Sequence, residues 1–171
     1  YYDFDCSWSE DGRKIVFNRL PAPPFTAPSQ IWLMDANGSN MERITEGGDN
    51  PDNEEPQGVF PIGLDADPHL SPDNKRIVFS RLKTGKENEP FGIYELIVVD
   101  VDSKEENVLD SSYANMLPEW KSGGILFIRQ VGTAKPMDIQ QGLCLYRDGK
   151  FDQLEEFPYN VFPIGAYSAS W

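Results

Sequence analysis

The segment Asp65-Ala-Asp-Pro-His-Leu-Ser-Pro-Asp-Asn-Lys-Arg-Ile-Val-Phe-Ser-Arg81 decides the fold, because the chain repeats its pattern. A close copy runs from Asp3 to Arg19, and a looser copy runs from Asn115 to Arg129. The last five residues, 167–171, begin a further copy. The copies recur at intervals of roughly 50 to 60 residues, a period typical of solenoids, propellers and other repeat arrays. The sequence therefore predicts a repeat architecture.

Each repeat is expected to form four short strands. In the central copy, residues 67–70 lead into the turn Ser-Pro-Asp-Asn, and the β-branched strand 76–80 follows. A second apolar run, 93–100, and a short one, 107–109, complete the repeat. No stretch of the chain has helical periodicity over ten residues, so an all-β protein is expected. The matching strands are predicted at 14–18, 31–34 and 41–45 in the first repeat and at 125–129, 143–146 and 151–154 in the third.

Four antiparallel strands per repeat, arranged around an axis, form a β-propeller. The chain is expected to be one partial propeller domain, 1–171, with blade 1 at 1–46, blade 2 at 65–110, blade 3 at 115–156 and the first strand of another blade at 166–171. Three blades do not close a propeller, since closed rings have about four to eight. Either the chain is a fragment of a longer propeller, or two copies join as a homodimer in a six-bladed ring. In the dimer, segment 166–171 would compete with residues 2–8 of the other copy.

The motif Trp8-Ser-Glu-Asp-Gly12, with Ile15-Val-Phe17 and the segments 31–38 and 43–45, resembles the WD-like repeat of the TolB propeller family. The resemblance extends over nearly the whole chain, and it is weaker in the third repeat, where both turns are shorter. It implies a propeller of six or seven blades, often periplasmic or exported. The family includes TolB itself and the propeller domains of prolyl-oligopeptidase-like enzymes.

Composition narrows the classes of partner. A hydrophobic content of 39% with 12% aromatic residues is typical of a folded domain. A net charge of −13 argues against nucleic acid and anionic membranes as partners, because both require clustered Lys and Arg; the alternative to a merely solvated surface is attraction to cations or a basic partner. No apolar run is long enough for a membrane span. Cys6 and Cys144 lie on different repeats without metal-type spacing, and both are predicted to be buried thiols.

Arg19, Arg81 and Arg129 occupy one position, two residues after the phenylalanine of the second strand in each repeat. Strand alternation puts each arginine on the same side as that phenylalanine. Asp3 and Asp65 begin the first strands at the same rim. Two interpretations stay open, because the planar guanidinium group suits both: Arg–carboxylate clamps within or between blades, or a ring of arginines for an anionic ligand.

The long connections predict where a partner binds. They fall at 20–30, 82–91, 130–141 and 46–64, all on one face of the propeller, and loops of this length tend to carry function. A protein partner or a small ligand is expected on this long-loop face. The pentapeptide Val-Phe-Pro-Ile-Gly occurs twice on this face. Two roles stay open for it: packing at the entry to a strand, or a hydrophobic lip at the mouth of the central channel. The aromatic candidates on this face are Phe25, Phe60 and Phe162.

Catalytic and metal motifs are not found. The sequence has no Gly-x-Ser-x-Gly nucleophile motif, and one histidine, His69, cannot supply the ligand set of a propeller lyase with a transition metal. His69 is predicted to pack or to line the channel. No metal site and no cofactor are therefore expected. Two segments are weak candidates for Ca²⁺: the turn Asp35–Asn40, and an acidic loop that suits Ca²⁺ better. This loop contains Asp49, Asp52, Glu54 and Glu55.

These observations favour a non-catalytic TolB-like β-propeller that serves as a binding or scaffold module. The alternative is the substrate-gating propeller domain of a prolyl-oligopeptidase-like serine peptidase whose catalytic domain lies outside this chain. A Gly-x-Ser-x-Gly segment downstream in the parent gene would favour the alternative.

Overall fold

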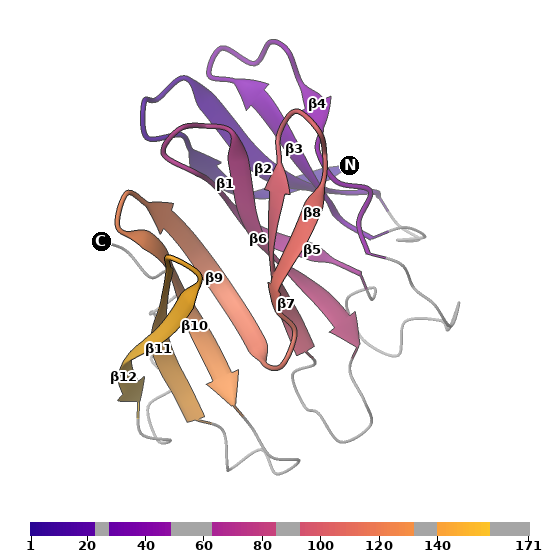
Figure 1. The fold of residues 1–171 in the computed structure, drawn as a ribbon. Helices are drawn as coiled ribbons and strands as arrows, with labels where there is room; N and C mark the ends of the chain where they lie inside the picture. Colours follow the sequence, from indigo (N-terminus) through magenta and orange to yellow (C-terminus); the bar gives the residue numbers. More distant parts are fainter. Residues whose placement is uncertain (23–27, 49–62, 85–92, 132–139, 158–171) are drawn as a thin grey trace.

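A computed structural model describes residues 1–22, 28–48, 63–84, 93–131 and 140–157 (Figure 1). All regular elements in these ranges are β-strands, grouped as three sets of four antiparallel strands, which are the expected blades. Among these residues no helix is long and apolar enough to cross a membrane. The predicted strand 166–171 lies outside the described residues.

The blades follow one another along the chain, and within each blade consecutive strands are neighbours. A single parallel pair, Tyr94 with Ala114, connects the sheets of blades 2 and 3. Blade 1 contains β1 (Tyr2–Trp8), β2 (Lys14–Leu20), β3 (Gln30–Asp35) and β4 (Glu42–Arg43). Blade 2 contains β5 (Asp65–Leu70), β6 (Arg76–Thr84), β7 (Ile93–Asp100) and β8 (Glu106–Asp110). Blade 3 contains β9 (Ala114–Lys121), β10 (Gly124–Val131), β11 (Gln140–Arg147) and β12 (Lys150–Phe157).

The second and third strands of each blade carry apolar residues on both of its faces. We call the side that carries Phe17, Phe79 or Phe127 the Phe face, and the opposite side the reverse face. Alternation puts neighbouring residues of a strand on opposite faces. Blade 2, in the middle of the molecule in Figure 1, is therefore covered on both sides.

Two larger hydrophobic cores lie between the faces of neighbouring blades, and a third, smaller one contains Leu20 of blade 1 with Leu64 and Ala66. The first core joins the reverse face of blade 1, with Val16 and Leu33, to the Phe face of blade 2, with Ile77 and Phe79. The second joins the reverse face of blade 2 to the Phe face of blade 3, where Phe127 is fully buried. The same pairing of faces is thus used at both junctions between blades.

The first strand of every blade contains a bulge at the same place. Asp5, Asp67 and Leu117 have φ angles of 47°, 53° and 53°, and the register of pairing shifts beside each of them. Aspartate adopts this left-handed conformation more readily than most residues, and leucine does so rarely. The sequence analysis missed the bulge, because no glycine marks it.

The prediction of two buried cysteines is wrong for Cys6. Cys144 is buried, but Cys6 on β1 is exposed. The equivalent residues of blades 2 and 3, Pro68 and Pro118, are buried. The repeat pattern predicts burial from the positions within a blade, whereas Cys6 lies in the blade whose Phe face has no neighbour among the described residues.

Candidate binding interface

The Phe face of blade 1 is apolar and has no blade packed against it in the part of the chain that the structure describes. A cavity of about 320 Å³ opens on this face, lined by Trp8, Ile15, Phe17 and Met34 among others. Trp8 is 58% exposed and Met41 is 43% exposed. The described part of blade 1 therefore exposes apolar side chains on this face.

The corresponding residues of blade 2 show what the face normally contacts. Leu70 occupies the position of Trp8 and is 2% exposed, and Ile77 and Phe79 are fully buried against blade 1. The Phe face of blade 1 therefore has the composition of a surface that another blade covers elsewhere in this molecule. We call this surface, together with its cavity, the free Phe face.

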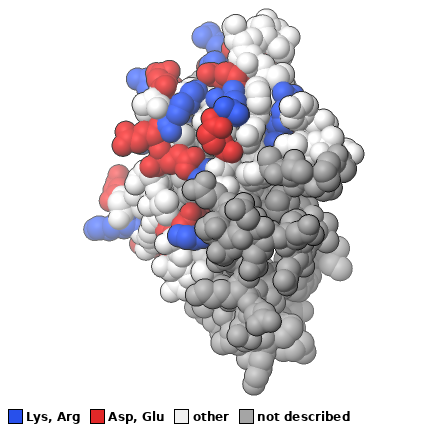
Figure 2. Space-filling model, turned by 90° about the vertical axis from the view of Figure 1, so that its right-hand side faces the viewer, with Lys and Arg blue, Asp and Glu red and all other residues white. Residues whose placement is uncertain are grey.

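The predicted arginine series lies along one rim of the blades. Arg19, Arg81 and Arg129 pair directly opposite Asp3, Asp65 and Asn115 on the first strands. Each guanidinium lies over the phenylalanine two residues before it, with its carbon 5.1–5.3 Å from the ring centroid. The predicted side of the strand is thus correct. Among the described side chains visible in Figure 2, acidic and basic groups are interspersed.

The unit in blade 2 is buried. Arg81 donates to both carboxylate oxygens of Asp65, at 2.6 and 3.1 Å, and to both carboxylate oxygens of Glu106, at 2.6 and 2.9 Å. Thr45 of blade 1 donates its hydroxyl to Asp65. Burial raises the pKa of Asp65 to about 6, against the opposing effects of Arg81 and Thr45. Although burial disfavours its charged form, hydrogen bonds to Glu106 and Asp65 raise the pKa of Arg81.

The unit in blade 3 uses a carboxylate from the preceding blade. Asn115 replaces the aspartate and accepts a hydrogen bond from Arg129 Nε at 3.2 Å. Arg129 Nη2 pairs with Asp110 at the end of β8, at 2.5 Å. Arg129 therefore joins blade 3 to blade 2.

The unit in blade 1 is the most exposed of the three. Arg19 donates through Nε and Nη2 to Asp3 at 2.7 and 2.8 Å, and the Asp3 side chain is 48% exposed. The hydrogen bond from Arg19 lowers the pKa of Asp3. The remaining nitrogen, Nη1, lies 3.2 Å from the thioether sulfur of Met41. The guanidinium also lies over the rings of Tyr1 and Trp32.

All three arginines are therefore engaged with acidic or amide side chains, which is the clamp interpretation of the sequence. The other interpretation, in which the three arginines form a ring that binds an anionic ligand, stays a prediction. The sequence analysis missed Thr45 and Asp110, the residues that connect neighbouring blades. An alignment of the ends of the fourth strands would have shown that both occupy one position of the repeat.

A second acidic feature lies on the first strands. Asp5 accepts hydrogen bonds from Asn18 Nδ2, at 3.2 Å, and from the backbone of Asp67. Asp67 accepts from the backbone N–H of Leu117 at 3.4 Å. Burial, with a smaller effect of the charge on Asp5, raises the pKa of Asp67 to about 6, and burial also raises the pKa of Asp5. The bulge thus connects successive blades through carboxylate-to-backbone hydrogen bonds.

The other predicted site residues divide into two groups. His69 is half-buried on β5; its Nδ1 lies 3.1 Å from the Leu70 carbonyl, and burial lowers its pKa. The aromatic candidates and the acidic loop lie outside the described residues: Phe25, Phe60, Phe162, Asp49, Asp52, Glu54 and Glu55. Within the described ranges, no group of three or more His, Cys, Asp or Glu side chains is placed to hold a metal ion.

Comparison with known proteins gives a likeness of fold. No protein-family model and no curated protein matches the sequence. Among solved structures, TolB from Acinetobacter baumannii is similar, with a TM-score of 0.53 and 18% identity over 90% of this chain and 32% of TolB. The β-propeller domain of the Trilobed protease from Pyrococcus furiosus is also similar, with a TM-score of 0.54 and 15% identity. The match covers 90% of this chain and 42% of that domain's chain.

The Pyrococcus horikoshii acylaminoacyl peptidase gives a TM-score of 0.54 and 16% identity, over 90% of this chain and 25% of the peptidase. The chain spans less than half the length of each of these three proteins. At such identities the likeness concerns the fold alone. This chain has the fold of the β-propellers of TolB and of peptidases, and it forms three blades of a partial propeller.

Proposed function

We propose that this chain is a non-catalytic β-propeller module that acts by binding a protein partner, and that the free Phe face of blade 1 is a binding surface. The exposure of Trp8 beside a cavity of about 320 Å³ carries this proposal. An exposed indole at the edge of an apolar hollow has the composition of an interface hot spot. The long-loop face, with Phe25, is a second candidate surface of the same module. A periplasmic or exported location belongs to the same proposal.

The face is suited to a protein rather than to a small polar ligand. Its lining is mostly apolar, and the charged lining residue Asp3 is paired with Arg19 at the rim. Interfaces between proteins commonly combine an apolar centre with a polar rim. We expect the partner to present an apolar surface, flanked by a group that reaches the Arg19–Asp3 pair at the rim.

Site-specific photo-crosslinking tests the proposal. A photo-reactive benzoylphenylalanine replaces Trp8 in the protein expressed in cells of its source organism, and adducts are identified by mass spectrometry. The control carries the same group at Asn37, in the exposed turn between β3 and β4. We expect a protein adduct at position 8 that is not formed at position 37. Equal labelling, or no adduct at position 8, would contradict the proposal.

The second candidate is a propeller domain that gates access to a peptidase. It is favoured by the likeness to the Trilobed protease and to the acylaminoacyl peptidase. The parent gene distinguishes the two: a Gly-x-Ser-x-Gly segment downstream of residue 171 would support the gating domain. A parent gene with further repeats and no hydrolase domain would support the binding module.

A further inference from the structure

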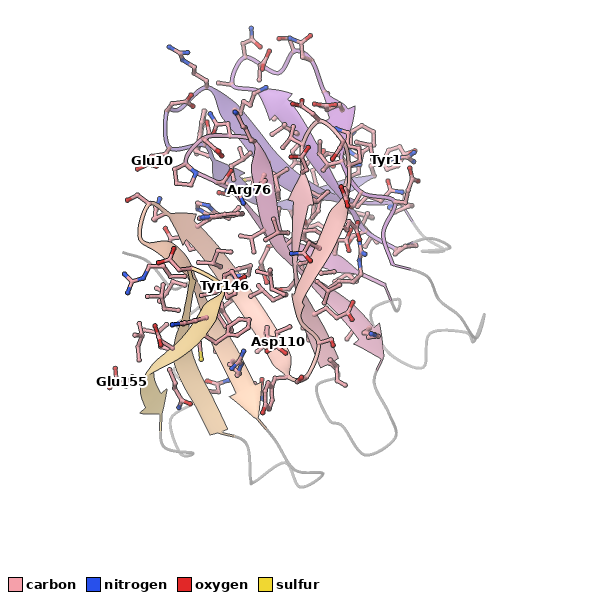
Figure 3. All side chains as sticks on the ribbon, in the orientation of Figure 1. Tyr1, Glu10, Arg76, Asp110, Tyr146 and Glu155 are labelled. Carbon is pink, nitrogen blue, oxygen red and sulfur yellow. The ribbon has the colours of Figure 1, made fainter. Side chains whose placement is uncertain are left out.

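The turn between β3 and β4 contains an asparagine followed by a glycine and a serine, Asn37-Gly38-Ser39. All three residues are exposed. Asparagine and glycine are common together in tight turns because both tolerate a left-handed backbone, and Gly38 has a φ of 84°. Figure 3 shows this turn at the upper end of blade 1, away from the labelled Asp110 and Glu155.

The side-chain oxygen of Asn37 accepts two hydrogen bonds from one residue. The Ser39 N–H donates to Asn37 Oδ1 at 2.9 Å, and the Ser39 hydroxyl donates to the same oxygen at 2.7 Å. The hydroxyl has a single proton, and its other acceptor, Asp35 Oδ2, is more distant at 3.3 Å. Among the described residues, none accepts a hydrogen bond from Asn37 Nδ2. The side-chain amide is therefore polarised at its oxygen, and its nitrogen is left to solvent.

The backbone nitrogen of Gly38 is the nucleophile that lies next to this amide along the chain. Gly38 has no side chain, and no atom lies within 4 Å of a Cβ placed there, so nothing obstructs the approach. The Gly38 N–H donates to the Asp35 carbonyl at 2.8 Å, and this hydrogen bond must open before the nitrogen can react. Because the bond closes an exposed turn outside the core, it opens locally, without unfolding of the blade.

We propose that Asn37 is a site of spontaneous deamidation, at which Ser39 stabilises the negative charge that forms on Asn37 Oδ1 while the Gly38 nitrogen displaces ammonia. Hydroxide takes the proton of the Gly38 N–H, the nitrogen forms a bond to Asn37 Cγ, and the Cγ–Nδ2 bond breaks. Water then opens the resulting succinimide at either of its two carbonyl carbons. Donors aimed at an oxygen where charge develops are the arrangement of an oxyanion hole.

The two products differ in their effect on the turn. Opening at Cγ gives aspartate and keeps the backbone, and blade 2 shows that an acid fits there: Asp102 occupies the position of Asn37, two residues after the aspartate that ends the third strand. Opening at the backbone carbon gives isoaspartate, which lengthens the main chain and displaces the hydrogen bond between the Asp35 N–H and the Ser39 carbonyl. Both products add a negative charge to blade 1. The inference goes beyond the proposed function, since it requires no partner.

Peptide mapping by mass spectrometry tests the proposal on the purified 171-residue chain, incubated at mildly alkaline pH. Asn40 is the internal control in the same turn, because it is also exposed but is followed by Met41. We expect Asn37 to convert at least about tenfold faster than Asn40, since the side chain of Met41 hinders the same attack. Methylation by an isoaspartate-specific carboxyl methyltransferase identifies the isoaspartate.

Two variants test the part assigned to Ser39. Ser39→Ala removes the hydroxyl donor and should slow the conversion of Asn37 about threefold or more, whereas Ser39→Thr keeps the hydroxyl and should keep most of the rate. In concentrated urea, where the turn is not held, the three chains should convert at similar rates. Circular dichroism establishes that each variant is folded without urea.

Conversion of Asn37 no faster than that of Asn40 would overturn the proposal. Equal rates for folded wild type and Ser39→Ala would overturn the role of Ser39. A slower reaction of Ser39→Ala that persists unchanged in urea would also overturn that role, because the effect would then come from the local sequence and not from the folded turn.

Discussion

The same ion pair has different energetic consequences in blades 1 and 2, because burial differs. The Arg81 side chain is 12% exposed and Asp65 is fully buried, whereas Asp3 in the Arg19 pair is 48% exposed. Removing one member of a buried pair leaves an uncompensated charge in the interior. We therefore expect Arg81→Met to lower the free energy of unfolding by about 3–5 kcal/mol. Arg19→Met should lower it by about 1 kcal/mol or less. Urea unfolding of both variants measures the difference.

The double variant Arg81→Met/Asp65→Asn separates the loss of an attraction from the cost of a stranded charge. Because the asparagine is neutral, the double variant should recover a large part of the stability lost by Arg81→Met. Equal losses for the variants at positions 19 and 81 would contradict the burial argument.

Asp67 lowers the stability of the folded chain as pH rises, which is the opposite of the usual effect of an acidic side chain. Its pKa of about 6 in the folded chain exceeds the ordinary value of 3.8, because burial disfavours the charged carboxylate. Between these two values the folded chain binds more protons than the unfolded chain, so the contribution of Asp67 to stability falls as pH rises through this window. The cost of ionising Asp67 is complete above pH 6 and is absent below pH 3.8.

We expect Asp67→Asn to be more stable than wild type at pH 7.5, and its advantage to shrink by about 1–2 kcal/mol on acidification to pH 5. Asparagine keeps an oxygen for the Leu117 N–H and tolerates the left-handed backbone. Urea unfolding at several pH values measures the difference, with the exposed turn variant Asp102→Asn as control. A constant difference between Asp67→Asn and wild type from pH 5 to pH 7.5 would show that Asp67 is not the titrating group.

At the scale of elements, two glycines hold together the ends of the connection between blades 1 and 2. The Gly48 N–H donates to the Gly63 carbonyl at 2.9 Å, and the Gly63 N–H donates to Leu82 at 2.8 Å. Gly63 has a φ of 82°, and a Cβ there would lie 2.2 Å from the Gly48 oxygen. The same contact places Gly48 against the Arg81 side chain. Only glycine fits at this crossing.

Gly63→Ala should therefore cost about 3 kcal/mol or more of unfolding free energy, because backbone strain and displacement of Gly48 add together. Gly12→Ala is the matched control. Gly12 also has a positive φ, of 68°, but no atom lies within 4 Å of its added Cβ, so only the strain of about 1–2 kcal/mol applies. Thermal melting compares the two variants, and similar melting temperatures would contradict the steric part of this account.

The strands were predictable from sequence where apolar residues run without interruption. The predicted strand 93–100 agrees with β7 at both ends, and β6 begins at Arg76 as expected. β6 extends four residues beyond its predicted end at Ser80, because backbone pairing with β7 continues after the apolar run stops. The position of the arginines followed from alternation alone. The contact of Asp110 with Arg129 of the next blade did not, because a bulge beside Asp110 changes which residues share a face.

At the scale of the whole molecule, burial divides the chain into a protected centre and two outer blades. In blade 2, four consecutive residues of β6, Ile77 to Ser80, are fully buried, because one blade covers each face. β1 is mostly exposed, and residues 151–155 of β12 are all exposed. Repeat proteins gain stability from contacts between neighbouring units, so the unit with two neighbours is the most stable.

Native-state hydrogen exchange followed by mass spectrometry tests this order. Amides of β6 and β7 should exchange only through global unfolding, and their protection should match the free energy from urea unfolding. Amides of β1 and β12 should exchange by local opening, with protection at least about tenfold lower, since separating an outer strand exposes little buried surface. Protection of β1 equal to that of β6 would mean that the three blades open as one unit, and that the stability of the centre does not depend on its two neighbours.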